Sequence, residues 1–531
     1  MAAVSRRGFL AGGAALLGTT ALAACGNPAT LPRSLEAVRP GAGGKPNRGG
    51  VLHFGLSTDP ANLDPHVSTG SASDYLRQMT YNGLVQYDGS GEIVADLASE
   101  FGWADDVTYE VKLRSGVQFH DGSTLTAEDV VFSFQRMMDE KTAASSAPLL
   151  GLVDSVTAVS STTVVFRLKE PDVAFPFALA APPSTIVSKK WMESGVDPMT
   201  QVMGTGPFKF VARIPGVSTT FTRFDNYYEP DLPYLNGIVF QPMSDDYARV
   251  TALRTATVDM IDYVPATHVD VIAENPRLRF RSDRNFGFGF VGFVTSKPPF
   301  DDVRVRKAVA MAIDRPSMLD TAFLGHGSPM DGALMPKAFA PYAPELEGSI
   351  GYDPDQAKFL LKQAGQEGLT LPVVTTSTYS VIARPAQAML SGLRAAGIEV
   401  KLTQQEWLTF RASVTAKEFP VHSWGTAPKF GDPASLGDFI GSEGVFAANL
   451  DFKDSTIDDL LGQGRRTKDP GLRDEIYRDA EKRALELAPM TYTIRREQGE
   501  AHYDYVKGYD HPPKGAWTAI ALRRTWLERT P

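Results

Sequence analysis

The chain has 531 residues, of which 43% are hydrophobic and 22% charged, and its formal net charge is −9. This length predicts about three structural units with ample core, and the acidic balance argues against nonspecific binding to nucleic acid or anionic lipid. Cys25 is the only cysteine, which excludes an intrachain disulfide and any centre that needs several cysteines.

Residues 1–24 have the pattern of an export signal. Arg6 and Arg7 form a twin-arginine pair ahead of an apolar stretch rich in Ala, Gly and Leu, which is too short and too often interrupted by glycine for a permanent membrane span. A twin-arginine pair directs export by a bacterial route. The run Leu22-Ala23-Ala24-Cys25 resembles a lipobox, in which the cysteine receives a diacylglycerol after cleavage. The alternative is an ordinary signal peptide with a chance cysteine.

The next segments predict a tether and then a folded body. Residues 25–48 are rich in Pro and Gly and are expected to be flexible. Residues 108–114 alternate apolar and polar side chains, which indicates a half-buried strand. Thr126 is a predicted N-cap, with Glu128 and Asp129 in the first turn of the helix that follows.

Helical signals become more frequent beyond about residue 290. Asp353-Pro354 and Asp469-Pro470 are each an N-cap followed by proline at the first helical position. Residues 385–397 predict a helix that ends in glycine and leads into a strand from Ile398. Helix, glycine and strand in quick succession predict an α/β fold with a domain boundary near residue 290.

Common catalytic and metal-binding motifs are absent from the sequence. There is no Gly-x-Ser-x-Gly, His-Glu-x-x-His, Cys-x-x-Cys or P-loop, and the eight histidines are scattered, so we expect no metal and no cofactor. Residues 287–292 fit Gly-x-Gly-x-x-Gly, but Pro298-Pro299 soon afterwards prevents the helix that a dinucleotide loop must open. The carboxylates are numerous, so an extracytoplasmic hydrolase of a sugar or peptide is the enzyme alternative.

Several collinear segments together resemble one family, the extracellular solute-binding proteins of the peptide/nickel class, which includes dipeptide- and oligopeptide-binding proteins and feeds ABC importers. The segments that carry the resemblance are 108–114, 116–122, 125–134, 204–208, 225–228, 233–235, 301–308, 312–315, 352–354 and 397–400. The resemblance runs from about residue 50 to 510. It implies capture of a solute without catalysis.

The resemblance also implies an architecture, namely two α/β lobes joined by hinge strands, as in periplasmic binding proteins. The ranges that follow are residues 49–288 for the first lobe, with an extra subdomain at about 61–200, then 289–497 for the second lobe and 498–531 returning to the first. Its implied partners are an ABC permease, the permease's ATPase and a peptide or other small solute. We expect a monomer that is held at the membrane through its lipid anchor and binds no nucleic acid.

The family's most informative ligand loop corresponds to residues 423–433. In peptide-binding members a tryptophan stacks near the ligand, and an aspartate three residues later pairs with the peptide ammonium. Trp424, Gly425, Thr426, Phe430 and Asp432 are therefore candidate ligand-binding residues. Ala427 stands where that aspartate is expected, which weakens the peptide assignment. Either Asp432 replaces it, or Lys429 favours an acidic or neutral solute, and Trp424 could also be a core residue.

Four further candidates lie elsewhere in the sequence. Thr69 and Ser71 belong to a loop after the first strand, and Tyr379 and Arg384 are placed just before the predicted helix at Pro385. Arg384 could pair with a ligand carboxylate or form a surface salt bridge. The sequence leaves open the identity of the solute, and a structural or chaperone-like lipoprotein is the third functional hypothesis.

Overall fold

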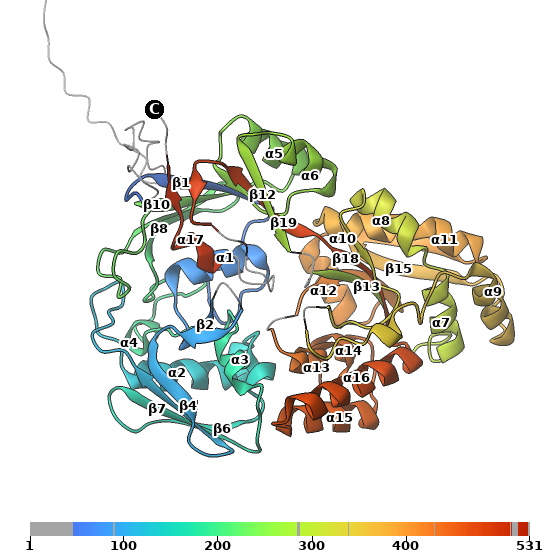
Figure 1. Ribbon diagram of the computed structural model, residues 1–531, viewed down its shortest axis with the longest axis horizontal. Helices are drawn as coiled ribbons and strands as arrows, with labels where there is room; N and C mark the ends of the chain where they lie inside the picture. Colours follow the sequence, from blue (N-terminus) through green and yellow to red (C-terminus); the bar gives the residue numbers. More distant parts are fainter. Residues whose placement is uncertain are drawn as a thin grey trace, which may run out of the picture.

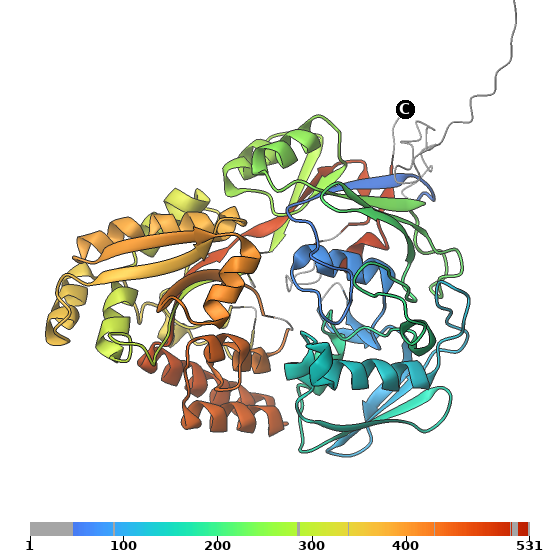
Figure 2. The ribbon, with the colours of Figure 1, turned by 180° about the vertical axis from the view of Figure 1, so that it is seen from behind.

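The computed structural model describes residues 46–88, 91–283, 287–337, 339–428, 431–509, 511 and 519–528. Arg6, Arg7, Cys25, Lys429 and Phe430 lie outside these ranges. Two lobes stand side by side in Figure 1, one built mainly from the first half of the chain and the other from the second half. Figure 2 shows the same division from behind.

A seven-stranded mixed sheet forms the centre of the first lobe. Its strands, in spatial order, are β12 (Leu278–Asp283), β19 (Gln498–Tyr503), β11 (Met260–Ile261), β1 (Val51–Leu56), β10 (Gly237–Pro242), β9 (Ser218–Arg223) and β8 (Phe208–Ile214). β1 runs parallel to both of its neighbours, and its residues are buried along most of their length, as expected for a central strand. The helices of this lobe include α1 (Ser71–Thr80), α5 (Asp246–Arg254), α6 (Ala266–Ala273) and α17 (Ala519–Leu522).

A four-stranded antiparallel sheet forms a second, smaller layer of the first lobe. Its order is β4 (Ala98–Trp103), β5 (Thr108–Leu113), β7 (Thr163–Leu168) and β6 (Val153–Ala158), and α2 (Ala127–Met138) packs on it. β5 buries alternate side chains, which confirms the strand predicted from its alternation. Nearby are β2 (Val85–Tyr87), β3 (Ile93–Ala95), α3 (Phe175–Ala180) and α4 (Lys189–Met192). Thr126 and Asp129 form the capping box of α2, so the predicted N-cap is correct.

A six-stranded sheet is the centre of the second lobe. Its order is β14 (Gly327–Pro329), β18 (Met490–Arg496), β13 (Phe288–Phe293), β17 (Val421–Thr426), β15 (Thr370–Thr376) and β16 (Glu399–Gln405). Its helices are α7 (Val303–Met311), α8 (Arg315–Phe323), α9 (Pro354–Gln363), α10 (Ser380–Ala388), α11 (Leu390–Ala395), α12 (Trp407–Thr415), α13 (Gly437–Ile440), α14 (Val445–Asn449), α15 (Ser455–Arg466) and α16 (Pro470–Leu487). Residues 287–292 thus belong largely to a strand, which agrees with the rejection of a dinucleotide loop.

Local signals in the second lobe were predicted well, with one exception. Asp353 and Asp469 cap α9 and α16 through their carboxylates, and proline follows each of them at the first helical position. The helix predicted to begin at Pro385 begins instead at Ser380 and contains that proline. Burial of Ile382, Ala383 and Ala386 on one face outweighs the missing hydrogen bond. Tyr379 is therefore the N-cap residue of α10, and Arg384 lies within the helix.

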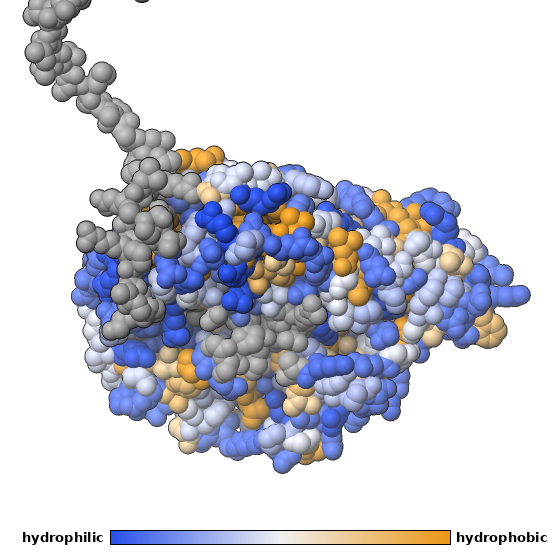
Figure 3. Space-filling model, turned by 45° about the horizontal axis from the view of Figure 1, so that its top comes forward, coloured by the Kyte–Doolittle hydropathy of each residue, from blue (hydrophilic) through white to orange (hydrophobic). Residues whose placement is uncertain are grey.

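The chain crosses between the two large sheets twice. One crossing joins β12 to β13, and the other joins β18, which ends at Arg496, to β19, which begins at Gln498. The face seen in Figure 3 is mostly hydrophilic, with separate apolar patches. Within the ranges the structure describes, no helix has both the length and the apolar character to cross a membrane, and no cluster of three or more His, Cys, Asp and Glu side chains could hold a metal ion.

Candidate functional site

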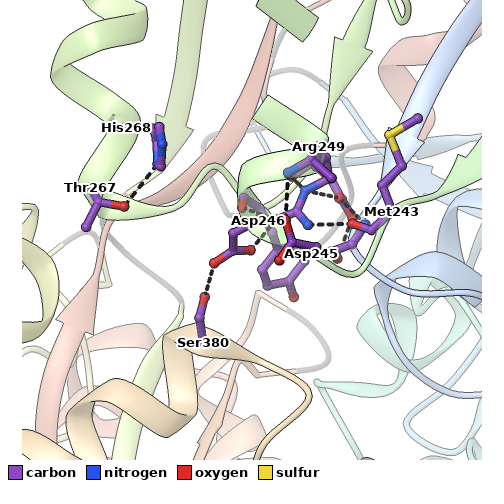
Figure 4. Close-up of polar contacts among 11 residues, drawn as sticks. Met243, Asp245, Asp246, Arg249, Thr267, His268 and Ser380 are labelled. Atoms are coloured by element: carbon purple, nitrogen blue, oxygen red, sulfur yellow. Dashed lines mark hydrogen bonds and ion pairs between the residues drawn. The ribbon is translucent and has the colours of Figure 1, made fainter. Parts of the chain in front are cut away.

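Two sets of polar contacts join the lobes along what we call the interlobe seam. At one end Ser380 of α10 donates to Asp246 of α5 over 2.7 Å, and Arg411 of α12 donates to Thr69 over 2.9 Å. Figure 4 shows Ser380 pointing at Asp246, with Arg249 bonded to the same carboxylate from the side of the first lobe. These contacts hold the N-terminal ends of α1 and α5 against the second lobe.

The other end of the seam is closed by ion pairs. Arg465 holds Asp172 with two nitrogen–oxygen contacts of 2.5 and 3.1 Å. Arg466 pairs with Glu170 at 3.3 Å, and Lys468 pairs with Asp106 at 2.6 Å. In both ribbon views α15, which carries both of these arginines, lies beside the small sheet of the first lobe. The two lobes are therefore in contact at both ends of the seam, in a closed arrangement.

Aromatic residues surround Trp424 in the core of the second lobe. Trp424 lies on β17 and is only 9% exposed. Trp407 and Phe446 meet its indole edge-on, with ring centroids 5.5 and 5.6 Å away, and Phe410 packs 4.9 Å away. Trp424 is therefore a member of the core of the second lobe, which favours the core interpretation over direct stacking on a ligand.

Two tyrosines meet at the boundary of the lobes. Tyr263 follows β11 in the first lobe, Tyr379 caps α10 in the second, and their ring centroids are 6.2 Å apart. Burial raises the pKa of Tyr379, while a hydrogen bond with Thr58 of the first lobe lowers it, with the net shift upward. Tyr263 has φ 44°, a left-handed conformation that is uncommon for a bulky residue and often marks functional sites.

Arg496 lies in the same region, at the end of β18 where the chain leaves the second lobe. Its side chain is buried, at 6% exposed, and its Nε has no hydrogen-bond partner. A Cβ atom on Gly425 would lie 2.9 Å from Nη1, and one on Gly287 would lie 2.7 Å from Nε. The two glycines therefore make the room that the guanidinium occupies. Burial lowers the pKa of Arg496, and the neighbouring Tyr263 and Tyr379 oppose that shift.

The remaining predicted residues of the first lobe lie at the seam as well. Thr69 bonds Arg411, and Ser71 begins α1 with its Oγ buried and without a partner among the described residues. Between them Gly70, at φ 96°, brings the backbone close to Tyr379, since a Cβ there would be 3.9 Å from the phenol oxygen. Thr69, Ser71 and Tyr379 are thus brought together from opposite lobes.

Two other predicted residues, Arg384 and Asp432, are placed less favourably for contact with a ligand than Thr426. Arg384 lies near His268 of α6 and is one of the charges that lower the pKa of that imidazole, after burial and against Asp246. Asp432 has both carboxylate oxygens engaged by Arg473, at 2.6 and 3.0 Å, and also caps a short 3-10 helix. This pairing assigns Asp432 a structural role and argues against its replacing the aspartate absent at Ala427. Thr426, at the end of β17, is partly exposed.

Sequence reasoning missed Arg496, Arg411 and Tyr263. Arg496 is marked by two glycines, Gly287 and Gly425, that make space for its guanidinium, and Tyr263 is marked by its left-handed backbone conformation. Neither feature can be recognised from residue types alone. Tyr87 was missed too, and its hydroxyl accepts a 3.3 Å hydrogen bond from the backbone nitrogen of Gly431 across the seam.

Comparison with known proteins identifies the family. The family model described as "Bacterial extracellular solute-binding proteins, family 5 Middle" matches residues 92–446. The chain belongs to this family. The match confirms the predicted α/β fold, because the solved structures of similar proteins are two-lobed periplasmic binding proteins.

Three relatives illustrate the range of similarity. The structure of the binding protein AgaA from A. tumefaciens R10, in complex with agropinic acid, is 33% identical, has a TM-score of 0.86 and covers 91% of this chain and 99% of its own. The di/tripeptide-binding protein 1 of Pseudomonas aeruginosa is 28% identical over 83% of this chain and 88% of its own length. The glutathione-binding protein GsiB of Escherichia coli K12 is 26% identical over 84% of this chain and 89% of its own length. These similar proteins are binding proteins, which gives no support to the hydrolase alternative.

Proposed function

We propose that the protein captures a small polar solute between its lobes and delivers it to the permease of an ABC importer. Membership of the solute-binding family supports this proposal together with the seam, where polar contacts such as Ser380–Asp246 and Arg411–Thr69 join the two lobes beside Tyr379. Closing two rigid lobes over a solute removes it from water, so a few fixed polar groups can provide specificity.

The names of the three relatives describe binding of agropinic acid, di- and tripeptides, and glutathione. We propose that the present chain binds a small polar solute of comparable size. Thr69, Ser71, Tyr379, Thr426 and the backbone at Gly425 are the proposed contacts. Trp424 packs on Trp407, which in turn packs on Tyr379, so Trp424 supports the position of Tyr379 from the core of the second lobe.

Residues 1–25 support a further proposal, that the body is exported by the twin-arginine route and anchored through a lipid on Cys25. The anchor and the tether would hold the two lobes beside the permease. Replacing the anchor with C25S should release the protein from the membrane fraction without changing its affinity for solute. Retention of C25S in the membrane fraction would contradict the lipid anchor.

Calorimetry with agropinic acid, glutathione and the dipeptide Met-Leu, followed by mass spectrometry of the recovered solute, tests the capture function. Stoichiometric binding with the solute returned unchanged, and stimulation of the ATPase of the cognate permease by the loaded protein, is the expected result. A product formed from any of the three solutes would favour the hydrolase instead.

A further inference from the structure

Arg496 differs from every other buried arginine that the structure describes. Arg77, Arg249 and Arg523 are each bonded to at least one carboxylate. Arg306 and Arg315 donate to several backbone carbonyls. No ion pair and no hydrogen bond from the Arg496 guanidinium is found within the described part of the chain.

An unpaired guanidinium in a buried position is unfavourable. Taking a charged group out of water costs several kcal/mol unless a counter-charge and hydrogen bonds compensate. Arginine remains charged at neutral pH even when burial lowers its pKa, so the cost is not avoided by loss of the proton. Either the site opens to water when the lobes separate, or an anion fills it when they close.

The position of Arg496 favours the second arrangement. The residue ends β18 at one of the two crossings between the lobes, and its neighbours Tyr263 and Tyr379 come from opposite lobes. Gly287, just before β13, and Gly425, in β17, make room beside it, since a side chain at either glycine would collide with the guanidinium. The site is therefore assembled only where the lobes meet.

We propose that Arg496 is the anion-binding residue of the seam, and that the solute carries a carboxylate or a similar oxyanion which docks on this guanidinium. The planar fork of an arginine matches a carboxylate with two parallel hydrogen bonds, which gives both charge and orientation. Tyr263 and Tyr379 flank the anion. This inference rests on the proposed function, because it takes the seam to be where the solute sits.

The test uses the whole protein labelled with ¹⁵N-arginine, with the Nε–H resonance of Arg496 assigned by its absence from R496Q. Sodium succinate is the probe, and sodium chloride at equal ionic strength and neutral succinamide are its controls. We expect a saturable shift of the Arg496 resonance with succinate and none with either control. The same small drift with all three would overturn the proposal.

Two variants separate binding from folding. Because R496Q removes an unpaired charge, ligand-free R496Q should melt at the temperature of the wild type or above it, whereas a structural arginine would lower the melting temperature. For an acidic solute that the wild type binds, R496Q should weaken binding roughly ten- to hundredfold. R496K should lie between, since it keeps the charge but loses the fork.

R411Q is the matched control, because Arg411 also faces the seam and has no carboxylate partner among the described residues. Carboxylate binding that is lost in R411Q and retained in R496Q would overturn the proposal. If the protein binds succinate through Arg496 but never stimulates a permease, the proposed transport function is wrong and the role of Arg496 stands. If the protein captures neutral solutes and the Arg496 resonance does not shift, the transport function stands and the role of Arg496 is wrong.

Discussion

The pair formed by Arg465 and Asp172 offers the sharpest test of lobe closure. The carboxylate of Asp172 is 1% exposed, the guanidinium of Arg465 is 28% exposed, and two contacts of 2.5 and 3.1 Å join them across the seam. In R465Q the fork is lost while Asp172 keeps its bond to the backbone of Ala174 within its own lobe. The substitution therefore penalises the closed form and leaves each lobe intact.

The magnitude follows from the exposure of the pair. Truncating one member of a desolvated charge pair costs about 2–5 kcal/mol, and truncating one member of an exposed pair costs about 0.2–1 kcal/mol. With one partner buried and the other partly exposed, we expect about 2 kcal/mol, which is a roughly thirtyfold fall in the ratio of closed to open protein. The apparent affinity for solute should fall by up to the same factor, which is reached where only the closed form binds tightly and the open form predominates without solute.

Small-angle scattering and calorimetry on R465Q measure these two quantities. R466Q is the matched control, since its partner Glu170 and Arg466 itself are 44% and 43% exposed and the contact is longer, at 3.3 Å. R466Q should change affinity by less than about fivefold. Equal effects of the two substitutions, or an R465Q protein that closes as readily as the wild type, would show that the Arg465–Asp172 pair does not stabilise the closed form.

Two further predictions concern stability. D432A should lower the free energy of unfolding by about 3 kcal/mol in thermal or urea melts, because Arg473 is left partly buried without its carboxylate partner. Unchanged stability together with weakened solute binding would instead show that Asp432 is a ligand-binding residue. His422 is buried, and burial lowers its pKa to about 4, so its neutral form is favoured in the native state and the stability it provides is lost as pH falls from about 6.5 towards 4. Between pH 7 and pH 5 this loss is about 2 kcal/mol. The free energy of unfolding of H422F, measured in urea melts, should therefore fall by about 2 kcal/mol less than that of the wild type over this range. Identical pH profiles would contradict the lowered pKa of His422.

Local structure was predictable because its causes are local. Thr126, Asp353 and Asp469 act on backbone groups within three residues, and the alternation at β5 is visible in the sequence. The two-lobed fold followed from many weak segments in the right order. Pro385 misled the prediction because burial of one helix face, a tertiary effect, outweighed a local rule.

The site was less predictable because its properties arise between distant segments. Asp432 was a reasonable candidate until its partner was known, and Arg473 lies 41 residues further along the chain. The surroundings of Arg496 depend on residues of both lobes, on Gly287 just before β13 and on Gly425 in β17. The position of an arginine can be read from the sequence, but whether it has a carboxylate partner depends on the three-dimensional fold.

Closure of the lobes on a solute that is released unchanged can be measured on the wild-type protein. Small-angle scattering is recorded before and after addition of a solute that calorimetry shows to bind, and the solute is then recovered and its mass determined by mass spectrometry. We expect a smaller radius of gyration with solute and a recovered mass equal to the added mass. An unchanged radius, or a recovered mass that differs, would contradict this expectation.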